Sequence, residues 1–200
     1  MKKITYAKEI RYKGIPLKVN TCGGQLGCYS EILTAIASQL VYMYEKYSRI
    51  IVIVFDLHMA EGTANNEPIS MLFRSIRKIL QRTYGVKYYG YSWARELNPT
   101  ADLMSKQHYH AALILDNHSI KHPSKLLKHI ESFWTAEGRP KPYVGKNCYY
   151  HVPRGDIQKL SAAFYRMSYQ AKCRDKGNKH ATTNNYSTSR LKRNGGGNGD

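Results

Sequence analysis

Two histidines and a tyrosine in this sequence supply the side chains needed to cut a nucleic-acid strand. His108 and His110 lie two positions apart, just before the apolar run 111–115. On a β-strand the two imidazoles point to the same face, because side chains alternate along a strand, and they could hold one cation. Tyr169, with Lys172 three positions on, could attack a phosphodiester bound to that cation and stay joined to the cut end.

A cation needs further ligands, and Glu96 is the best candidate. It ends the predicted strand 86–96, and a loop leading to His108 would bring two antiparallel strand ends together. A carboxylate beside two imidazoles suits Mg²⁺ or Mn²⁺, with positions left open for water and phosphate. The alternative is an ordinary surface carboxylate that pairs with Arg95 or a lysine.

Asp56 and His58 follow the apolar run 50–55, which predicts a strand buried on both faces. Asp56 could act as a second carboxylate or position a metal ligand. Both side chains could equally cap the following loop through hydrogen bonds, and for His58 this structural role is the favoured interpretation.

The candidate nucleophile belongs to a predicted helix that begins at Asp156 and runs to about Lys172. On this helix Tyr165, Tyr169 and Lys172 fall within a narrow sector, opposite an apolar stripe. A phenol with a pKa near ~10 must lose its proton to attack, and Lys172 could stabilise the phenolate or protonate the leaving 3′ oxygen. With 17 tyrosines in the chain, simple packing is the alternative role. The stripe consists of Ile157, Leu160, Ala163, Phe164, Met167 and Ala171.

The elements that must position these residues indicate an α+β protein. Their order from residue 50 is strand, helix, strand, strand, helix, strand, helix, which predicts helices packed on a central antiparallel sheet in a two-layer sandwich. The first part of this order matches the split β-α-β arrangement of ferredoxin-like domains. The predicted strands are 50–55, 86–96, 108–115 and 148–152, and the predicted helices are 30–44, 66–80, 124–137 and 156–172.

The predicted domain organisation is a single domain, 1–176, followed by a tail. Within the domain, 1–48 is expected to be an amino-terminal extension with a hairpin at 9–20 and a helix, and 49–176 the catalytic core. Residues 177–200 are rich in Asn, Gly, Ser and Thr, and we expect this basic tail to be disordered because it cannot bury enough apolar surface. Its basic side chains could still touch phosphates; they are Arg190, Lys192 and Arg193.

The charge of the chain favours nucleic acid as a partner. Lys and Arg outnumber Asp and Glu by 31 to 14, which gives a net charge of +17 and attracts polyanions. The longest apolar run, 50–55, is far short of the ~20 residues that span a membrane, and charged residues follow Met1 where a signal peptide would be apolar. We therefore expect a cytoplasmic protein with no membrane partner.

Cysteine usage predicts free thiols, because the four cysteines form no CxxC pair. A zinc site made by Cys22, Cys28 and a distant histidine is the less favoured alternative.

Four segments together resemble the rolling-circle replication initiators of the HUH endonuclease superfamily. More narrowly, the chain is similar to the inovirus-type replication protein family of phages and integrated elements. The segments that carry this resemblance are Phe55-Asp56-Leu57, Trp93-Ala94-Arg95-Glu96, His108-Tyr109-His110 with the apolar run behind it, and 164–172.

The resemblance implies a ferredoxin/RRM-like central sheet, His108 and His110 as ligands of Mg²⁺ or Mn²⁺, and Tyr169 as the nucleophile of a Tyr-x-x-Lys motif. Tyr165 would match the first tyrosine of a two-tyrosine pair, and whether one or both act stays open. The implied activity is nicking and rejoining of single-stranded DNA through a 5′-phosphotyrosine. The implied partners are single-stranded or hairpin origin DNA, and the helicase and replication machinery of a bacterial host. Relaxases and transposases belong to the same superfamily, so they stay open as alternatives.

The nucleic acid would be held by the charge excess and by aromatic side chains. We expect Arg95, Arg166 and Lys176 among the residues that bind it. Exposed aromatics of the strand region could stack on bases, or simply pack; they are Tyr88, Tyr89, Tyr91 and Trp93. The alternative function is a non-catalytic, repressor-like nucleic-acid-binding protein on the same kind of sheet, which needs no tyrosine near the histidines.

Overall fold

A five-stranded antiparallel sheet is the centre of the computed structural model, which describes residues 3–97, 107–174, 176 and 183–191. Its strand order is β8-β5-β7-β6-β9, and every neighbouring pair runs antiparallel. The α+β class and the central antiparallel sheet are thus confirmed. The strands are β5 (Arg49–Met59), β6 (Gly90–Leu97), β7 (Gln107–Asp116), β8 (Tyr149–Pro153) and β9 (Tyr186–Thr188).

β5 carries apolar side chains on both faces and forces the sheet to be covered on both sides. Ile50 and Val52 belong to one buried cluster, whereas Ile51 and Ile53 belong to the other. Such a continuous apolar run is stable only when both faces are shielded from water. The expected burial of 50–55 on both faces is therefore confirmed.

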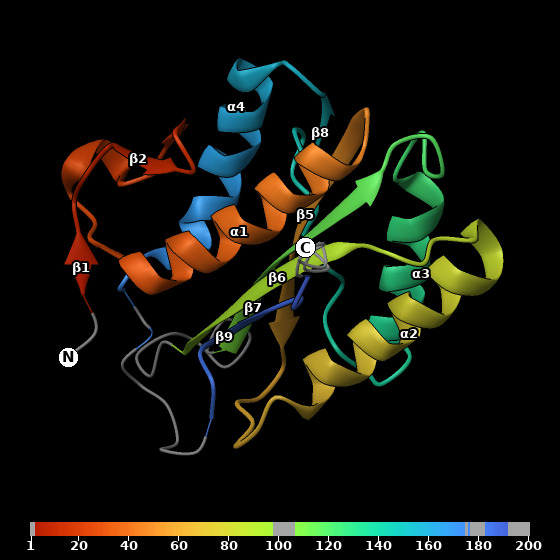
Figure 1. Cartoon of the computed structure of the whole chain (residues 1–200). Coiled ribbons are helices and arrows are strands. Elements are labelled where there is room, and N and C mark those ends of the chain that lie inside the picture. The colour runs from red at the N-terminus through yellow and green to blue at the C-terminus, as the bar shows by residue number, and fades with distance from the viewer. Residues whose placement is uncertain (1–2, 98–106, 175, 177–182, 192–200) are drawn as a thin grey trace, which may run out of the picture.

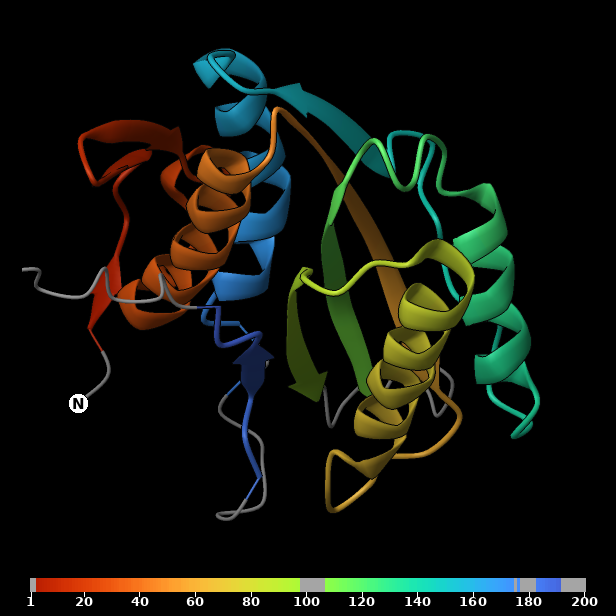
Figure 2. The same ribbon diagram turned by 45° about the vertical axis from the view of Figure 1, so that its right-hand side comes forward.

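Two pairs of helices provide this cover (Figures 1 and 2). α1 (Ser30–Lys46) and α4 (Ile157–Ser168) pack on one face, and α2 (Glu67–Tyr84) and α3 (Ser124–Thr135) pack on the other. The expected two-layer sandwich is wrong, because the structure has three layers. The element order alone did not reveal that α1 shares the second face with α4.

The amino-terminal segment packs against the rest of the domain. β2 (Glu9–Tyr12) and β3 (Ile15–Lys18) form the expected hairpin, and its turn places Lys13 and Gly14 at φ values of 51° and 78°, as a tight two-residue turn requires. Leu17 is fully buried in the same cluster as α1, β5 and α4. The segment predicted as an amino-terminal extension of the domain thus packs into the same core as residues 49–176. The segment also contains β1 (Ile4–Thr5), the short helix η1 (Cys22–Gly24) and β4 (Cys28–Tyr29).

The end of the chain corrects the expectation of a disordered tail over 177–200. Residues 183–191 are placed, and β9 adds an edge strand beside β6. Their polar side chains find internal partners: Ser189 Oγ lies 2.6 Å from Gln39 Oε1, and Thr183 Oγ1 donates to the Ala64 carbonyl at 2.6 Å. Strand pairing and side-chain hydrogen bonds order a segment that has little apolar surface. The expectations for 177–182 and 192–200, with Lys192 and Arg193, lie outside the described residues.

The last helix begins as expected but ends earlier. The Asp156 side chain accepts a hydrogen bond from the Lys159 backbone amide at 2.9 Å, which satisfies a donor at the helix start. α4 then ends at Ser168, and a tighter turn, η3 (Tyr169–Ala171), follows it. The expected α-helix as far as Lys172 is wrong, because its last turn is wound as a 3-10 helix.

Among the described residues, no helix is both long and apolar enough to cross a membrane. All four cysteines are free thiols, as predicted.

Candidate active site

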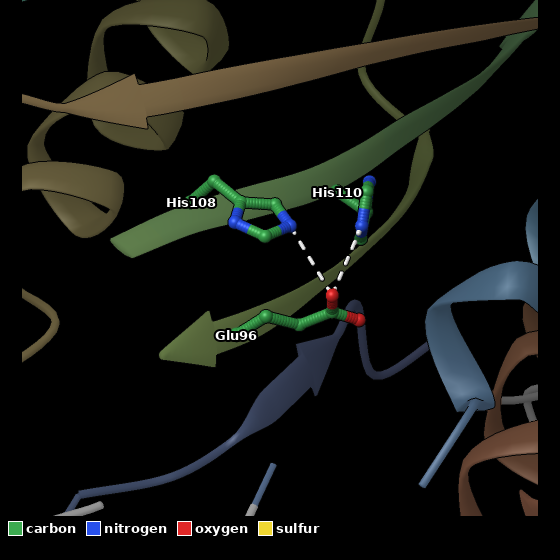
Figure 3. A group of neighbouring side chains, drawn as sticks. All are labelled: Glu96, His108 and His110. Atoms are coloured by element: carbon green, nitrogen blue, oxygen red, sulfur yellow. Dashed lines mark ion pairs between the residues drawn. The ribbon is translucent and has the colours of Figure 1, made fainter. Parts of the chain in front are cut away.

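Strand pairing brings the two histidines and Glu96 together on the face covered by α1 and α4. In the β6–β7 ladder Glu96 lies opposite His108, and His110 follows two positions on. His108 Nε2 and His110 Nε2 lie 3.1 Å and 3.4 Å from the same oxygen, Glu96 Oε2 (Figure 3). The ligand atoms of all three residues lie within 4.8 Å of one another, so this predicted grouping is confirmed.

These three residues could hold a metal ion. Glu96 is fully buried, and its Oε2 is the atom on which His108 Nε2, His110 Nε2 and Lys172 Nζ converge at 3.0 to 3.4 Å. One carboxylate oxygen and two imidazole nitrogens that converge on one point are a common set of metal ligands.

Asp56 holds His110 from the neighbouring strand. The two residues are paired in the β5–β7 ladder, and Asp56 Oδ1 lies 2.6 Å from His110 Nδ1. Burial raises the pKa of Asp56, but the hydrogen bond and charge of His110 outweigh burial and lower it. Nδ1 then carries the proton, so Nε2 is the nitrogen directed at Glu96. His58 only stacks on His108, with ring centroids 5.7 Å apart, in line with a structural role.

Tyr169 lies beside the histidines. Its ring centroid is 5.1 Å from that of His110, and the rings are nearly perpendicular at 80°. Lys172 Nζ donates a hydrogen bond to the Tyr169 hydroxyl at 2.8 Å and lies 3.0 Å from Glu96 Oε2. The lysine ammonium therefore connects the phenol to the carboxylate of the metal-ligand group.

Lys176 was predicted to bind nucleic acid, but it is buried beside Glu96. It is only 2 % exposed, and its Nζ lies 2.7 Å from Glu96 Oε1. Burial lowers the pKa of Lys176 more than the neighbouring Glu96 raises it. For Glu96 burial raises the pKa, but the hydrogen bonds of His108 and His110 and the charge of Lys176 hold it well below its usual range. Lys176 thus fixes the carboxylate and does not face nucleic acid.

Arg95 is also not available to nucleic acid. It is 2 % exposed, and its guanidinium donates to the Thr63 carbonyl and, at 2.9 Å, to Gln107 Oε1. Because side chains alternate along β6, Arg95 points to the α2 side while Glu96 points to the site. Arg166 lies near enough to Asp56 for its charge to lower the pKa of that carboxyl, so its predicted contact with nucleic acid stays a prediction.

No contact described for Tyr165 joins it to Glu96, His108 or His110. It is 43 % exposed and lines a separate groove with Lys18, Tyr150 and Ile157.

Two features were missed in the sequence. The first is the role of Lys176, which has no signal in the chain, since the segment after η3 reaches Glu96 only through the tertiary fold. The second is the pair Arg74 and Arg77, one turn apart on the exposed face of α2. Their spacing opposite the apolar stripe was a usable signal of a basic surface.

Fold and site together define an α+β protein that carries a buried carboxylate–imidazole group with a tyrosine beside it. A family model, the YagK/YfjJ C-terminal domain, matches residues 17–189, and the chain belongs to this family. The match runs from β3 past the end of β9, so α1 and the edge strand are part of the family's domain. No curated protein and no solved structure matches the chain.

Proposed function

We propose that this protein is a metal-dependent single-strand DNA endonuclease and strand transferase of the HUH type, which starts rolling-circle replication by nicking and rejoining an origin. The observation that carries the proposal is the convergence of Tyr169 and Lys172 on Glu96, His108 and His110. Tyr169 and Lys172 come from the segment that follows α4, whereas the other three residues come from the paired strands β6 and β7. A metal-ligand group with a phenol beside it is what this chemistry requires.

The fold is compatible with this proposal. The succession β5-α2-β6-β7-α3-β8 is the β-α-β-β-α-β order of ferredoxin-like domains. The histidines lie on the central strand β7 and the carboxylate on its neighbour β6, so the rigid sheet presets the separation of the ligands. The tyrosine lies outside the sheet, on η3.

The residues divide the chemistry between them. A divalent cation held by Glu96, His108 and His110, for which we propose Mg²⁺ or Mn²⁺, would supply Lewis-acid polarisation of the scissile phosphate. Asp56 keeps the His110 ring oriented for that ligation. Lys172 donates a hydrogen bond to the Tyr169 oxygen, so its ammonium is in place to stabilise negative charge that develops during the transfer.

The covalent step exchanges one phosphate ester for another. The Tyr169 oxygen bonds to phosphorus, the bond from phosphorus to the 3′ oxygen breaks, and the phenol proton is lost while the departing 3′ oxygen gains one. The 5′-phosphotyrosine conserves the ester bond, so a 3′ hydroxyl can attack it and rejoin the strand. We propose Tyr169 as the single nucleophile, because Tyr165 lines another groove.

The decisive experiment compares two matched tyrosine variants. A labelled single-stranded origin oligonucleotide is incubated with Mn²⁺ and run on a denaturing gel. Tyr169→Phe should abolish the covalent protein–DNA adduct, whereas Tyr165→Phe should leave it intact. An adduct that persists in Tyr169→Phe and disappears in Tyr165→Phe would show that Tyr165 is the nucleophile instead of Tyr169. If the unchanged protein forms no adduct with any origin oligonucleotide, the endonuclease proposal is wrong.

A second candidate function is supported by the two lysines on Glu96. Lys172 and Lys176 already balance the carboxylate, so the cluster could be a structural network in a non-catalytic nucleic-acid-binding protein. Calorimetric titration with Mn²⁺ separates the two candidates. The enzyme should bind one ion per chain, and Glu96→Gln should lose it, whereas the structural network should bind none.

The proposed partners are single-stranded or hairpin origin DNA and a bacterial host helicase that separates the strands.

A further inference from the structure

A basic and aromatic groove lies along β6 and β9 on the α2 side of the sheet, away from the face that holds Glu96. It consists of two adjoining hollows of about 510 and 290 Å³ that share Arg77, Tyr89, Tyr91 and Ser187. α2 forms one wall through Arg74, Arg77 and Gln81, and residues 187–191 form part of the other.

The cations of this groove have no acidic counterparts. Arg74 and Arg77 come from α2, Lys87 from the segment before β6, and Arg190 from the segment after β9. Within the described part of the chain, no carboxylate lines the groove, and none of these four side chains belongs to an ion pair. Four uncompensated positive charges along a concave surface focus a field that attracts phosphates.

Aromatic rings form the floor and rim of the same groove. Tyr89 is 8 % exposed and Trp93 6 %, so these two rings belong to the core. Tyr88 is half exposed at 50 %, and Lys46 Nζ lies over its ring at 4.7 Å from the centroid. Tyr91 is partly exposed and packs on Phe73, with centroids 4.6 Å apart. Tyr88 and Tyr91 are therefore the rings that a base could reach.

We propose that this groove binds a single-stranded DNA segment, with its phosphates on the four cations and its bases against Tyr88 and Tyr91. A positively charged channel with aromatic stacking positions is the common design for single strands, since every base has a π-face. This inference rests on the proposed function and identifies the surface that would bind the DNA strand. From Tyr91 to Glu96 the strand β6 advances about 17 Å, so a strand in the groove is held near the site but not within it.

The test uses two double variants on the same helix. Arg74→Ala/Arg77→Ala removes two groove charges, and Lys78→Ala/Arg82→Ala removes two exposed charges of α2 that do not line the groove. Both lower the net charge by the same amount. Binding of a fluorescein-labelled single strand is measured by anisotropy, in EDTA and in a Tyr169→Phe background, so that no chemistry contributes.

The groove variant should bind roughly 25-fold more weakly at about 0.1 M salt, with a salt slope smaller by about 1.4, since each phosphate contact on a single strand contributes ~0.7. The control variant should change binding by less than about twofold. Tyr88→Ala should weaken binding at least about fivefold, and Tyr88→Phe should retain it, because the ring provides the stacking.

Equal losses in the two double variants would overturn the proposal, as would tighter binding of duplex DNA or of an RNA strand of the same sequence. Thermal melting verifies that the variants fold, and Lys87→Ala tests the groove from a different element if Arg77→Ala disturbs Tyr89. The outcome is independent of catalysis. If the groove variant binds DNA more weakly but no covalent adduct forms, the DNA-binding groove stands and the endonuclease proposal is wrong. If an adduct forms but the groove variant binds DNA normally, the endonuclease proposal stands and the groove proposal is wrong.

Discussion

The two faces of strand β6 carry opposite kinds of polar surface. On the α1–α4 face, Glu96 is fully buried and meets two lysines and two imidazoles at 2.7 to 3.4 Å. On the α2 face, the groove beside Tyr91 has exposed cations and, among the described residues, no carboxylate. The first arrangement holds atoms in fixed positions, and the second attracts an extended anion. The comparison teaches that one strand can carry a buried ionic group and an exposed cationic groove, because alternate side chains point to opposite faces of the sheet.

The largest expected effect comes from removing a ligand on the buried face. His110→Ala should reduce the covalent adduct below detection, because the cation loses a ligand and Asp56 loses its partner, while single-strand binding in EDTA stays within about twofold. The control is His118→Ala, an exposed histidine at the other end of β7 that contacts Ser48. Loss of strand binding in His110→Ala would show that the two faces are not separable.

The next effect is on stability and contrasts a buried with an exposed ion pair. Lys176→Met should lower the free energy of unfolding by about 3 kcal/mol, since it breaks a fully buried pair. Lys141→Met removes a bridge to Glu131 at 2.8 Å between two exposed side chains and should cost under ~1 kcal/mol. Urea unfolding of the apo protein gives both values. Equal costs would mean that Lys176 does not hold Glu96 as described.

Salt should separate the faces without any mutation. Four phosphate contacts at a slope of ~0.7 each predict about 50-fold weaker single-strand binding when salt rises from roughly 50 to 200 mM. The single-turnover rate of adduct formation at saturating DNA should change little, because buried pairs are screened much less than exposed charges. A rate that falls in parallel with affinity would argue against this division.

The smallest effect concerns the orientation of one ligand. Asp56→Asn should weaken Mn²⁺ binding roughly tenfold, because the amide accepts from His110 Nδ1 less strongly than the carboxylate. Asp116→Asn, at the opposite end of β7 from the site, is the control. Titration calorimetry measures both affinities, and an unchanged affinity in Asp56→Asn would reduce Asp56 to a structural partner of the ring.

Much of the site could be predicted because it depends on local periodicity. The spacing of His108 and His110 places both rings on one face of any strand, and the segment ending at Glu96 could reach them only as an antiparallel neighbour. Lys176 and Arg95 were misassigned because positive charge alone does not tell a buried counter-ion from a surface contact. The tail was misjudged because composition reports apolar burial and ignores the hydrogen bonds that hold residues 183–191.

By itself the sequence determined the class of the fold, the both-sided burial of β5, and the pair of imidazoles on β7, because strand alternation and apolar runs act over a few residues. Only the tertiary structure decided that α1 covers the second face, that Lys176 meets Glu96, and that Tyr169 rather than Tyr165 lies at the histidines. These outcomes depend on how distant segments pack, and a contact between residues 80 positions apart is fixed by the whole core and by no local pattern.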